Sequence, residues 1–197
     1  MLAMDEMKKK QKHAQIESDI IRRSREVLSA REFTRLGIRE ICERIGITTG
    51  MFYRHFRNRN DLLSFCYIDE VAVQLEQAEK AGRGLPLPEQ LLLLEMGVVR
   101  SSLIMGPEGI FIFLNNENPA CDCSVTRSMT RDKISEAIRL SGISLSPGNS
   151  PEFVADRMTI ILKGLIFEWF TKKDDPSFDF IRCSEAMLRQ TIPALLS

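Results

Sequence analysis

Residues 38–56 constrain the fold of this chain most, because they set two short helical patterns on either side of a glycine. Four apolar residues share one face of the first pattern: Ile38, Ile41, Cys42 and Ile45. Gly46 follows where a helix C′ glycine belongs, and Thr48 is placed to cap a second helix that ends near His55. Two short helices at a sharp turn form a helix-turn-helix, whose second helix enters a DNA major groove.

The rest of the chain also shows helical spacing, with no sustained strand alternation. Prolines follow Gly106, Asn118, Ser150 and Asp175, and a proline at a first helical position is favourable. We therefore predict an all-α fold of about nine helices. The expected helices span residues 16–30, 38–45, 48–55, 60–80, 91–104, 107 onward, 119–140, 151–172 and 176–193.

Charge divides the 197-residue chain into two unlike parts. Lys and Arg number 27, as do Asp and Glu, so the zero net charge excludes a uniformly basic nucleic-acid binder. Residues 1–60 nevertheless hold fourteen basic and eight acidic side chains, whereas residues 61–197 hold thirteen and nineteen. A part with charge +6 joined to a part with charge −6 indicates a polyanionic partner for the first part alone.

Cysteine usage and hydropathy predict a cytoplasmic location without a membrane partner. The five cysteines are an odd number and follow no secretory signal, which is typical of a reducing compartment. No charge-free apolar run approaches the roughly 18 residues that a membrane span needs. The longest apolar candidate, residues 158–170, is short and is interrupted by Lys163 and Glu168.

The second helix of the helix-turn-helix carries side chains suited to DNA contact. Thr49 and Gly50 are small, so the backbone can approach DNA closely. Tyr53, Arg54 and His55 have polar ends that reach phosphates or base edges. In an alternative interpretation, Tyr53 and His55 pack against the first helix of the chain instead.

At these residues the sequence resembles the TetR family of bacterial transcriptional regulators. The resemblance runs from about residue 20 to residue 63, and Gly50, Tyr53 and Phe56 fall where the family has glycine, tyrosine and phenylalanine. The sequence departs from the family at four places. The glycine before the aromatic Phe33 is missing, and Gly37 replaces a serine or threonine cap. Thr49 replaces a lysine in the turn, and Arg59 replaces a lysine at the following corner.

The resemblance implies a flexible basic arm over residues 1–15, a three-helix DNA-binding domain over residues 16–62, and a ligand-binding and dimerisation domain over residues 63–197. It implies a repressor that binds a pseudo-palindromic double-stranded DNA operator as a homodimer and is released by a small-molecule effector. The implied phosphate contacts are Arg39, Thr48, Tyr53, His55 and Arg59. The implied groove contacts are Thr49, Gly50, Met51 and Arg54.

Residues 158–170 are apolar on nearly every face of a helix, and such a helix is buried from several sides. A second subunit would supply that cover, and Gly164 permits the close approach of another backbone. We therefore predict a twofold four-helix bundle built from the last two helices, with a thick monomeric core as the alternative. The predicted interface residues are Ile161, Gly164, Leu165, Glu168, Phe178, Ile181, Met187 and Leu188.

Apolar and methionine side chains in the same region are candidates for an effector pocket, although such residues serve equally well as core. The predicted pocket residues are Met96, Val99, Leu103, Phe111, Phe113, Met129, Met158 and Phe167. A glutamate inside the pocket, at position 95, 117 or 168, would favour a cationic ligand.

Two alternatives to an effector-controlled repressor remain open. Cys121 and Cys123 are a candidate redox sensor, because Cys121 would lie in the first turn of a helix, where a thiolate is favoured. The other alternative is a ligand-independent DNA-binding protein. The chain has only two histidines, His13 and His55, and lacks the common motifs of enzymes, so we predict no catalytic residue, no metal site and no cofactor.

Overall fold

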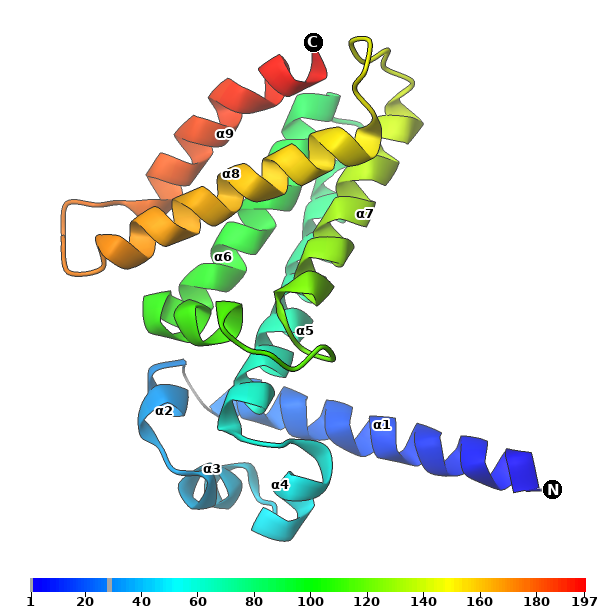
Figure 1. Ribbon diagram of the computed structural model, residues 1–197, viewed down its shortest axis with the longest axis vertical. Helices are drawn as coiled ribbons and strands as arrows, with labels where there is room; N and C mark the ends of the chain where they lie inside the picture. Colours follow the sequence, from blue (N-terminus) through cyan, green and yellow to red (C-terminus); the bar gives the residue numbers. More distant parts are fainter. Residues whose placement is uncertain (1, 28–29) are drawn as a thin grey trace.

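A computed structural model describes residues 2–27 and 30–197, and within these residues the chain is all-helical, as predicted. Figure 1 shows α1–α4 at one end of the molecule, α6–α9 at the other, and α5 running between them. The helices are α1 (Leu2–Val27), α2 (Ala30–Arg35), α3 (Ile38–Ile45), α4 (Thr49–His55), α5 (Arg59–Gly82), α6 (Leu87–Leu114), α7 (Cys123–Ser141), α8 (Pro151–Thr171) and α9 (Phe180–Leu196).

Helices α3 and α4 form the predicted helix-turn-helix. Gly46 ends α3 in the left-handed conformation, with φ of 71°, where a side chain would be strained. Thr48 caps α4, because its hydroxyl oxygen accepts a hydrogen bond from the backbone N–H of Met51 at 3.1 Å. Phe52 and Phe56 are buried beneath the turn with ring centroids 5.5 Å apart, so packing fixes the two helices from below.

Helix α5 belongs to both ends of the molecule. Its first turns bury Leu62 and Leu63 in the common core, and its later turns pack along α6. The two helices approach closely at Gly97, where an added Cβ would lie 3.2 Å from the carbonyl oxygen of Gln74. Helix α5 therefore connects the packing of the two ends of the molecule.

Helix α6 is one element with a sharp kink, where the sequence predicts two helices over residues 91–104 and from residue 107. Gly106 has a φ of 72° and a ψ of 163°, and Pro107 follows it. Because proline lacks a backbone N–H and glycine tolerates the left-handed region, the helix axis bends here. The last turns of α6 then lie across the lower end of the C-terminal region, which comprises α6–α9, and they lie near α2 (Figure 1).

Helix α7 begins later than its proline position predicts. The Asn116 side chain accepts a hydrogen bond from the Asn118 N–H (3.0 Å), and the Asn118 side chain accepts one from the Ala120 N–H (3.2 Å). Such local bonds compete with helix formation. The helix starts only at Cys123, capped by Asp122, rather than at residue 119.

Helix α9 is delayed for the same reason. The Asp175 carboxylate accepts a hydrogen bond from the Ser177 N–H at 2.9 Å, which forms a turn after the expected start at residue 176. Asp179 then caps α9 by accepting a hydrogen bond from the Arg182 N–H at 3.0 Å.

The N-terminal region, which comprises α1–α4, contains more helix than the sequence predicts. Residues 2–15, expected as a flexible arm, are helical and continuous with the rest of α1. The short helix α2 was not expected as a separate element. The expected first helix ends at residue 30, and residues 28 and 29 of that prediction lie outside the described residues.

Among the described helices, α6 is long and apolar enough by length and composition to cross a membrane, with a mean hydropathy of 1.4 in its most apolar window. Helix α6 is not a charge-free run, because it contains Glu95 and Arg100, so it was not predicted as a candidate span. Half of that window is buried inside the fold, and Leu91 and Val99 are fully buried. The same hydropathy is found in the core helices of soluble proteins.

Candidate functional site

The outer face of α4 presents four of the predicted DNA-contact residues to solvent. These are Thr49, Gly50, Tyr53 and Arg54. Tyr53 keeps 58% of its surface exposed, whereas its neighbour Phe52 is fully buried and edge-on to the Tyr53 ring. The buried phenylalanine thus anchors a short helix whose opposite face carries exposed side chains that are either small or polar.

Three further predicted contacts lie beside this face. Arg39 is exposed near the start of α3, with its Nε 3.3 Å from the Glu43 carboxylate. Thr48 is exposed, and its hydroxyl hydrogen can still donate while the oxygen caps α4. Met51 is half-buried and packs against the core, so it offers less to a groove than the sequence suggests.

His55 does not serve as the predicted phosphate contact, because its side chain is 1% exposed and faces α1. It stacks on His13 with ring centroids 4.1 Å apart, as in the alternative interpretation of this residue. Burial, together with the neighbouring His13, lowers the pKa of His55, so the ring brings no positive charge to the α4 surface at neutral pH.

Arg59 is also placed differently from expectation. Its guanidinium donates a hydrogen bond to the carbonyl oxygen of Leu36 at 3.1 Å, and the residue is half-buried. Arg59 therefore joins the segment between α2 and α3 to the start of α5, and this hydrogen bond engages part of the guanidinium that was predicted to contact phosphate.

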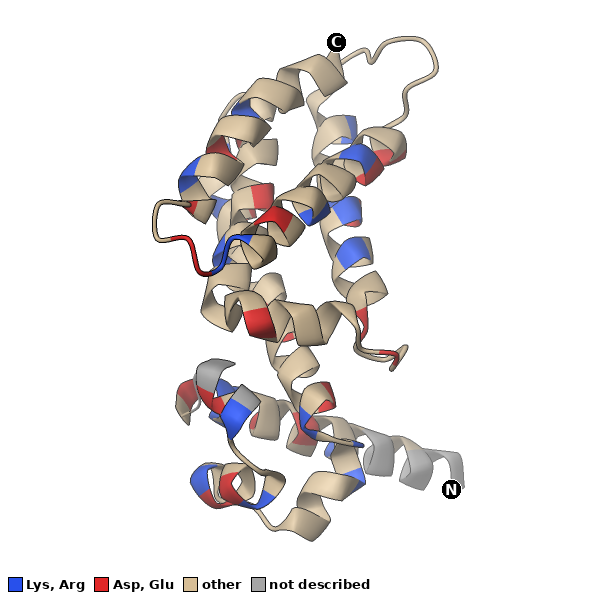
Figure 2. Ribbon diagram, turned by 60° about the vertical axis from the view of Figure 1, so that its left-hand side comes forward, with Lys and Arg blue, Asp and Glu red and all other residues tan. Residues whose placement is uncertain are grey.

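Charged residues of both signs lie on the helices of the N-terminal region (Figure 2). Several of its acidic groups are matched by arginines, such as Glu26 by Arg22 at 2.8 Å and Glu32 by Arg44. Helix α4 itself contains no Asp or Glu. A polyanion therefore meets no like charge on α4, whereas it would on the acidic C-terminal region.

A buried polar network ties the N-terminal region to the loop after α6. Asp61, in the first turn of α5, is 1% exposed and accepts hydrogen bonds from the Arg57 guanidinium (2.8 Å) and the Asn118 amide (2.9 Å). The Asn116 amide donates to the Ser64 hydroxyl at 2.8 Å. Burial alone would raise the pKa of Asp61, but the hydrogen bonds from Arg57 and Asn118 hold it below its ordinary value.

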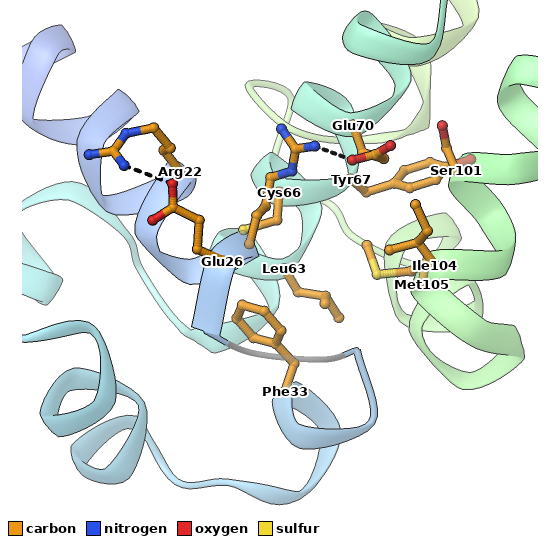
Figure 3. A pocket seen from close by; sticks show the side chains of 11 residues that line it. Arg22, Glu26, Phe33, Leu63, Cys66, Tyr67, Glu70, Ser101, Ile104 and Met105 are labelled. Atoms are coloured by element: carbon orange, nitrogen blue, oxygen red, sulfur yellow. Dashed lines mark hydrogen bonds and ion pairs between the residues drawn. The ribbon is translucent and has the colours of Figure 1, made fainter.

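A cavity of about 420 Å³ lies at the same junction, lined by residues of α1, α2, α5 and α6 (Figure 3). Arg25 reaches from α1 to the carboxylates of Asp69 and Glu70 on α5. Apolar walls come from Phe33 and Met105, among others. Because Arg25 already has two carboxylate partners, its charge is compensated within the protein.

Glu95 of α6 lacks such compensation. It is fully buried, and neither carboxylate oxygen has a hydrogen-bond partner among the described residues. It borders a cavity of about 40 Å³ between α5, α6, α7 and α8, which Tyr67, Thr126, Thr159 and Lys163 also line. Burial raises the pKa of Glu95 to about 8, so most of its carboxyl groups are protonated at neutral pH.

The predicted pocket residues do not line one cavity together. Phe113 borders the Glu95 cavity, whereas Phe111 and Phe167 are 50% and 66% exposed. The other five are buried or half-buried in the core: Met96, Val99, Leu103, Met129 and Met158. Apolar character did not locate the cavity, and of the three glutamates considered for the pocket, at positions 95, 117 and 168, only Glu95 borders this cavity.

An apolar stripe remains exposed on α8. Phe153, Ile160 and Phe167 recur every seven residues and are 40%, 65% and 66% exposed. Gly164 lies on the same face, with nothing within 4 Å of an added Cβ. On the neighbouring α9, Ile181 and Met187 are 44% and 42% exposed. These residues form the α8–α9 face.

The predicted interface residues divide between this face and the core. Gly164, Ile181 and Met187 are exposed on the α8–α9 face, and three others are half-buried: Ile161, Glu168 and Phe178. Leu165 and Leu188 turn inward and are buried in the core of their own chain, so they do not lie on the face. Sequence reasoning left out Ile160 and assigned Phe167 to the pocket.

The two candidate redox cysteines do not share an exposed site. Cys121 precedes α7 instead of lying in its first turn, and it is fully buried. Burial, with the nearby Asp61 carboxylate, raises the pKa of the Cys121 thiol to about 12. The prediction that the helix favours a thiolate at Cys121 is therefore wrong, because burial favours the neutral thiol. Cys123 is half-buried and borders the Glu95 cavity.

Comparison with known proteins relates both the site and the fold to bacterial regulators. Residues 20–64 match the family described as bacterial regulatory proteins, tetR family. No curated protein matches the chain in sequence. Solved structures match over most of the chain, and one is a TetR transcriptional regulator from Rhodococcus sp. RHA1, which is 16% identical, with 95% of this chain and 97% of that chain covered and a TM-score of 0.60.

Two further structural neighbours have named roles. The fatty acid degradation regulator FadR from Bacillus halodurans is 13% identical, with 89% of this chain and 96% of that chain covered and a TM-score of 0.64. SmeT, the repressor of the Stenotrophomonas maltophilia multidrug efflux pump SmeDEF, is 16% identical, with 90% and 88% covered and a TM-score of 0.59. At these identities the likeness establishes a shared TetR-like fold.

Proposed function

We propose, from the premise that residues 20–64 are a TetR-family DNA-binding domain on a TetR-like fold, that this chain is a transcriptional repressor rather than an enzyme. It binds a pseudo-palindromic operator in the cytoplasm as a homodimer and releases it when a small-molecule effector binds. The exposed face of α4 carries this proposal, since Thr49, Gly50, Tyr53 and Arg54 project from a helix fixed by a buried phenylalanine.

The DNA-binding part of the proposal is tested with DNA from upstream of the coding gene and its neighbours. Fluorescence anisotropy with that fragment and with a shuffled fragment of equal length measures the specificity ratio. We expect at least a 1000-fold preference for one palindromic segment at fixed salt, since specific sites typically exceed bulk DNA by about 10³ or more. Equal affinity for both fragments would instead favour a ligand-independent architectural protein.

The dimer is supported by the α8–α9 face. A second copy is the occupant that fits, because two such faces related by a twofold axis bury the same apolar stripe on each other as a four-helix bundle. The open surface at Gly164 allows the two α8 helices to approach closely. Two N-terminal regions held by such a bundle are the arrangement that a palindromic operator requires.

The effector part is supported by Glu95, and we assign the effector to organic molecules with a positively charged group. The buried carboxyl group has no partner among the described residues, and a cation in the adjoining cavity would favour release of its proton and pair with the carboxylate that results. The cavity of about 40 Å³ is too small for such a molecule, so binding must move α6, α7 or α8 apart. That movement reaches α4 through the Asp61 network and α5.

Thermal-shift measurements with matched compounds test this effector class. Alkyl ammonium, aryl phosphonium and amidinium compounds are compared with neutral analogues of the same shape, using the wild-type chain and Glu95→Gln. We expect stabilisation by at least one cation but not by its neutral analogue, with at least tenfold weaker binding to Glu95→Gln. Equal binding to both proteins would place the ligand elsewhere, with the larger junction cavity as the next candidate.

A further inference from the structure

The only two histidines of the chain, far apart in sequence, meet between α1 and α4. Glu17 lies one helical turn after His13 on α1, on the same face. Its Oε2 is 3.8 Å from Nε2 of His13 and 3.8 Å from Nδ1 of His55. One ligand atom from each of the three residues lies within 4.8 Å of the others.

We propose that His13, Glu17 and His55 bind a divalent transition-metal ion of the zinc type. Two imidazole nitrogens and one carboxylate oxygen form a ligand set that such ions accept, with a fourth position left for water. Ligand bonds of about 2.1 Å in a tetrahedral site place the ligand atoms about 3.4 Å apart. The two imidazole rings are stacked with an interplanar angle of 24°, so binding requires side-chain rotations that tilt them apart and direct both nitrogens at one ion.

The burial of His55 supports a ligand at this position. Its side chain is 1% exposed, and Nδ1 has no hydrogen-bond partner within the part of the chain that the structure describes. The 3.8 Å separation from Glu17 is too long for a hydrogen bond. Unpartnered buried nitrogens are rare because they lose their bonds to water without replacement, and a metal bond would satisfy this one.

The other two residues leave the site accessible. His13 is 49% exposed and Glu17 is 27% exposed, so an ion can enter from solvent along α1. A bound ion would join α1 to the last residue of α4 and hold the helix-turn-helix against the N-terminal helix. The sequence alone predicts no metal site, because His13 and Glu17 are only two ligands, and the third, His55, joins them only when α4 packs beside α1.

Cobalt(II) and zinc(II) titrations of the full chain test the proposal, with a phosphine reductant that keeps the cysteines reduced. We expect one cobalt ion per chain, with visible absorption typical of nitrogen and oxygen ligands, and displacement of cobalt by zinc. His13→Ala and Glu17→Gln should each weaken binding at least tenfold, whereas the exposed neighbour Lys12→Ala should bind as the wild type does.

Thermal unfolding gives a second readout of the same site. Zinc at about 100 times the wild-type Kd should raise the melting temperature of the wild type by roughly 5 °C, and at the same concentration His13→Ala should show at most about half of that rise. Absence of stoichiometric binding, or binding unchanged in both variants, would overturn the proposal. So would near-ultraviolet thiolate bands lost in Cys123→Ser, because they would locate the metal at a cysteine.

Discussion

The N-terminal and C-terminal regions differ in which groups they leave without partners. The N-terminal region leaves polar donors exposed on α4, above a fully buried Phe52. The C-terminal region leaves apolar side chains exposed on the α8–α9 face and a carboxyl group buried without a partner at Glu95. Each unpartnered group suggests a different partner, because donors suit phosphate, apolar surface suits another protein surface, and a buried carboxyl group suits a cation.

The comparison shows that exposure alone does not identify a functional surface. Leu140 is 80% exposed on α7, yet it is the one large apolar residue described as exposed on that helix. On α8 three exposed residues recur every seven positions, whereas Ile104 and Phe111, also exposed and seven apart, lie on either side of the α6 kink. The pattern of exposure, and not its amount, therefore sets the α8 stripe apart from other exposed apolar residues.

The largest expected effect is the pH dependence of stability that the buried carboxyl group of Glu95 produces. Its pKa is about 8 in the folded chain against an ordinary 4.5, so between these values the folded state keeps a proton that the unfolded state releases. The free energy of unfolding should therefore fall as pH rises from 4.5 to 8, by up to about 1.4 kcal/mol per pH unit.

Urea denaturation of the wild type and Glu95→Gln at several pH values measures this slope. The variant should lose this fall and keep the opposite contribution of His55, whose lowered pKa makes stability rise as pH approaches its ordinary 6.5. The exposed control Glu117→Gln should keep the wild-type slope. Equal slopes in the wild type and Glu95→Gln would show that the fold does not hold Glu95 protonated.

The next largest effect is expected on dimerisation, from a substitution on the α8–α9 face that leaves α4 unchanged. Ile160→Asp puts a charge in the centre of the apolar stripe, so dimerisation should weaken by at least 100-fold, or about 3 kcal/mol. Sedimentation velocity measures the change, and Leu140→Asp is the matched control on an exposed site outside the stripe. A dimer that persists in Ile160→Asp would move the interface away from α8.

A smaller effect is expected on α4. Arg54→Ala removes a predicted groove contact, so operator affinity should drop about tenfold, and the preference for the operator over a shuffled fragment should fall with it. Arg22→Ala on α1 is the control, since that arginine pairs with Glu26 instead. The dimer should survive Arg54→Ala, and an unchanged preference for the operator would show that Arg54 does not contact base edges.

The smallest effect belongs to the network between the two regions. The pKa of Asp61 is held below its ordinary 3.8, so its stabilisation is present at neutral pH and is lost as pH falls below that value. Asp61→Asn should lower stability at pH 7 and reduce the loss of stability between pH 4 and pH 3. Circular dichroism at these pH values tests this, with the exposed Asp174→Asn as the control.

The sequence predicted local structure wherever a single residue type determines it. The bounds of α3, the left-handed Gly46 and the Thr48 cap were all predicted, because turn and cap signals act within a few residues. The starts of α7 and α9 were misplaced, because asparagine and aspartate side chains formed turns after each proline.

Long-range placement was beyond the sequence for a different physical reason. A helix that is apolar all round has no preferred inward face, so nothing distinguished Leu165, which is buried, from Ile160, which is exposed. His55 likewise turned inward because α1 lies beside α4, and that contact depends on the tertiary fold. The exposed Tyr53 and Arg54 were predicted because their polar ends already disfavoured burial.

The close packing of α5 and α6 at Gly97 also bears on how the chain folds. The two helices are consecutive, so their contacts close only a short loop, and contacts between near neighbours in sequence form fast. We expect this helical hairpin to form early in folding, with the flanking helices condensing on it from both sides. Replacing Gly97 with a larger residue should then slow refolding as well as reduce stability, although Gly97 lies far from the exposed face of α4.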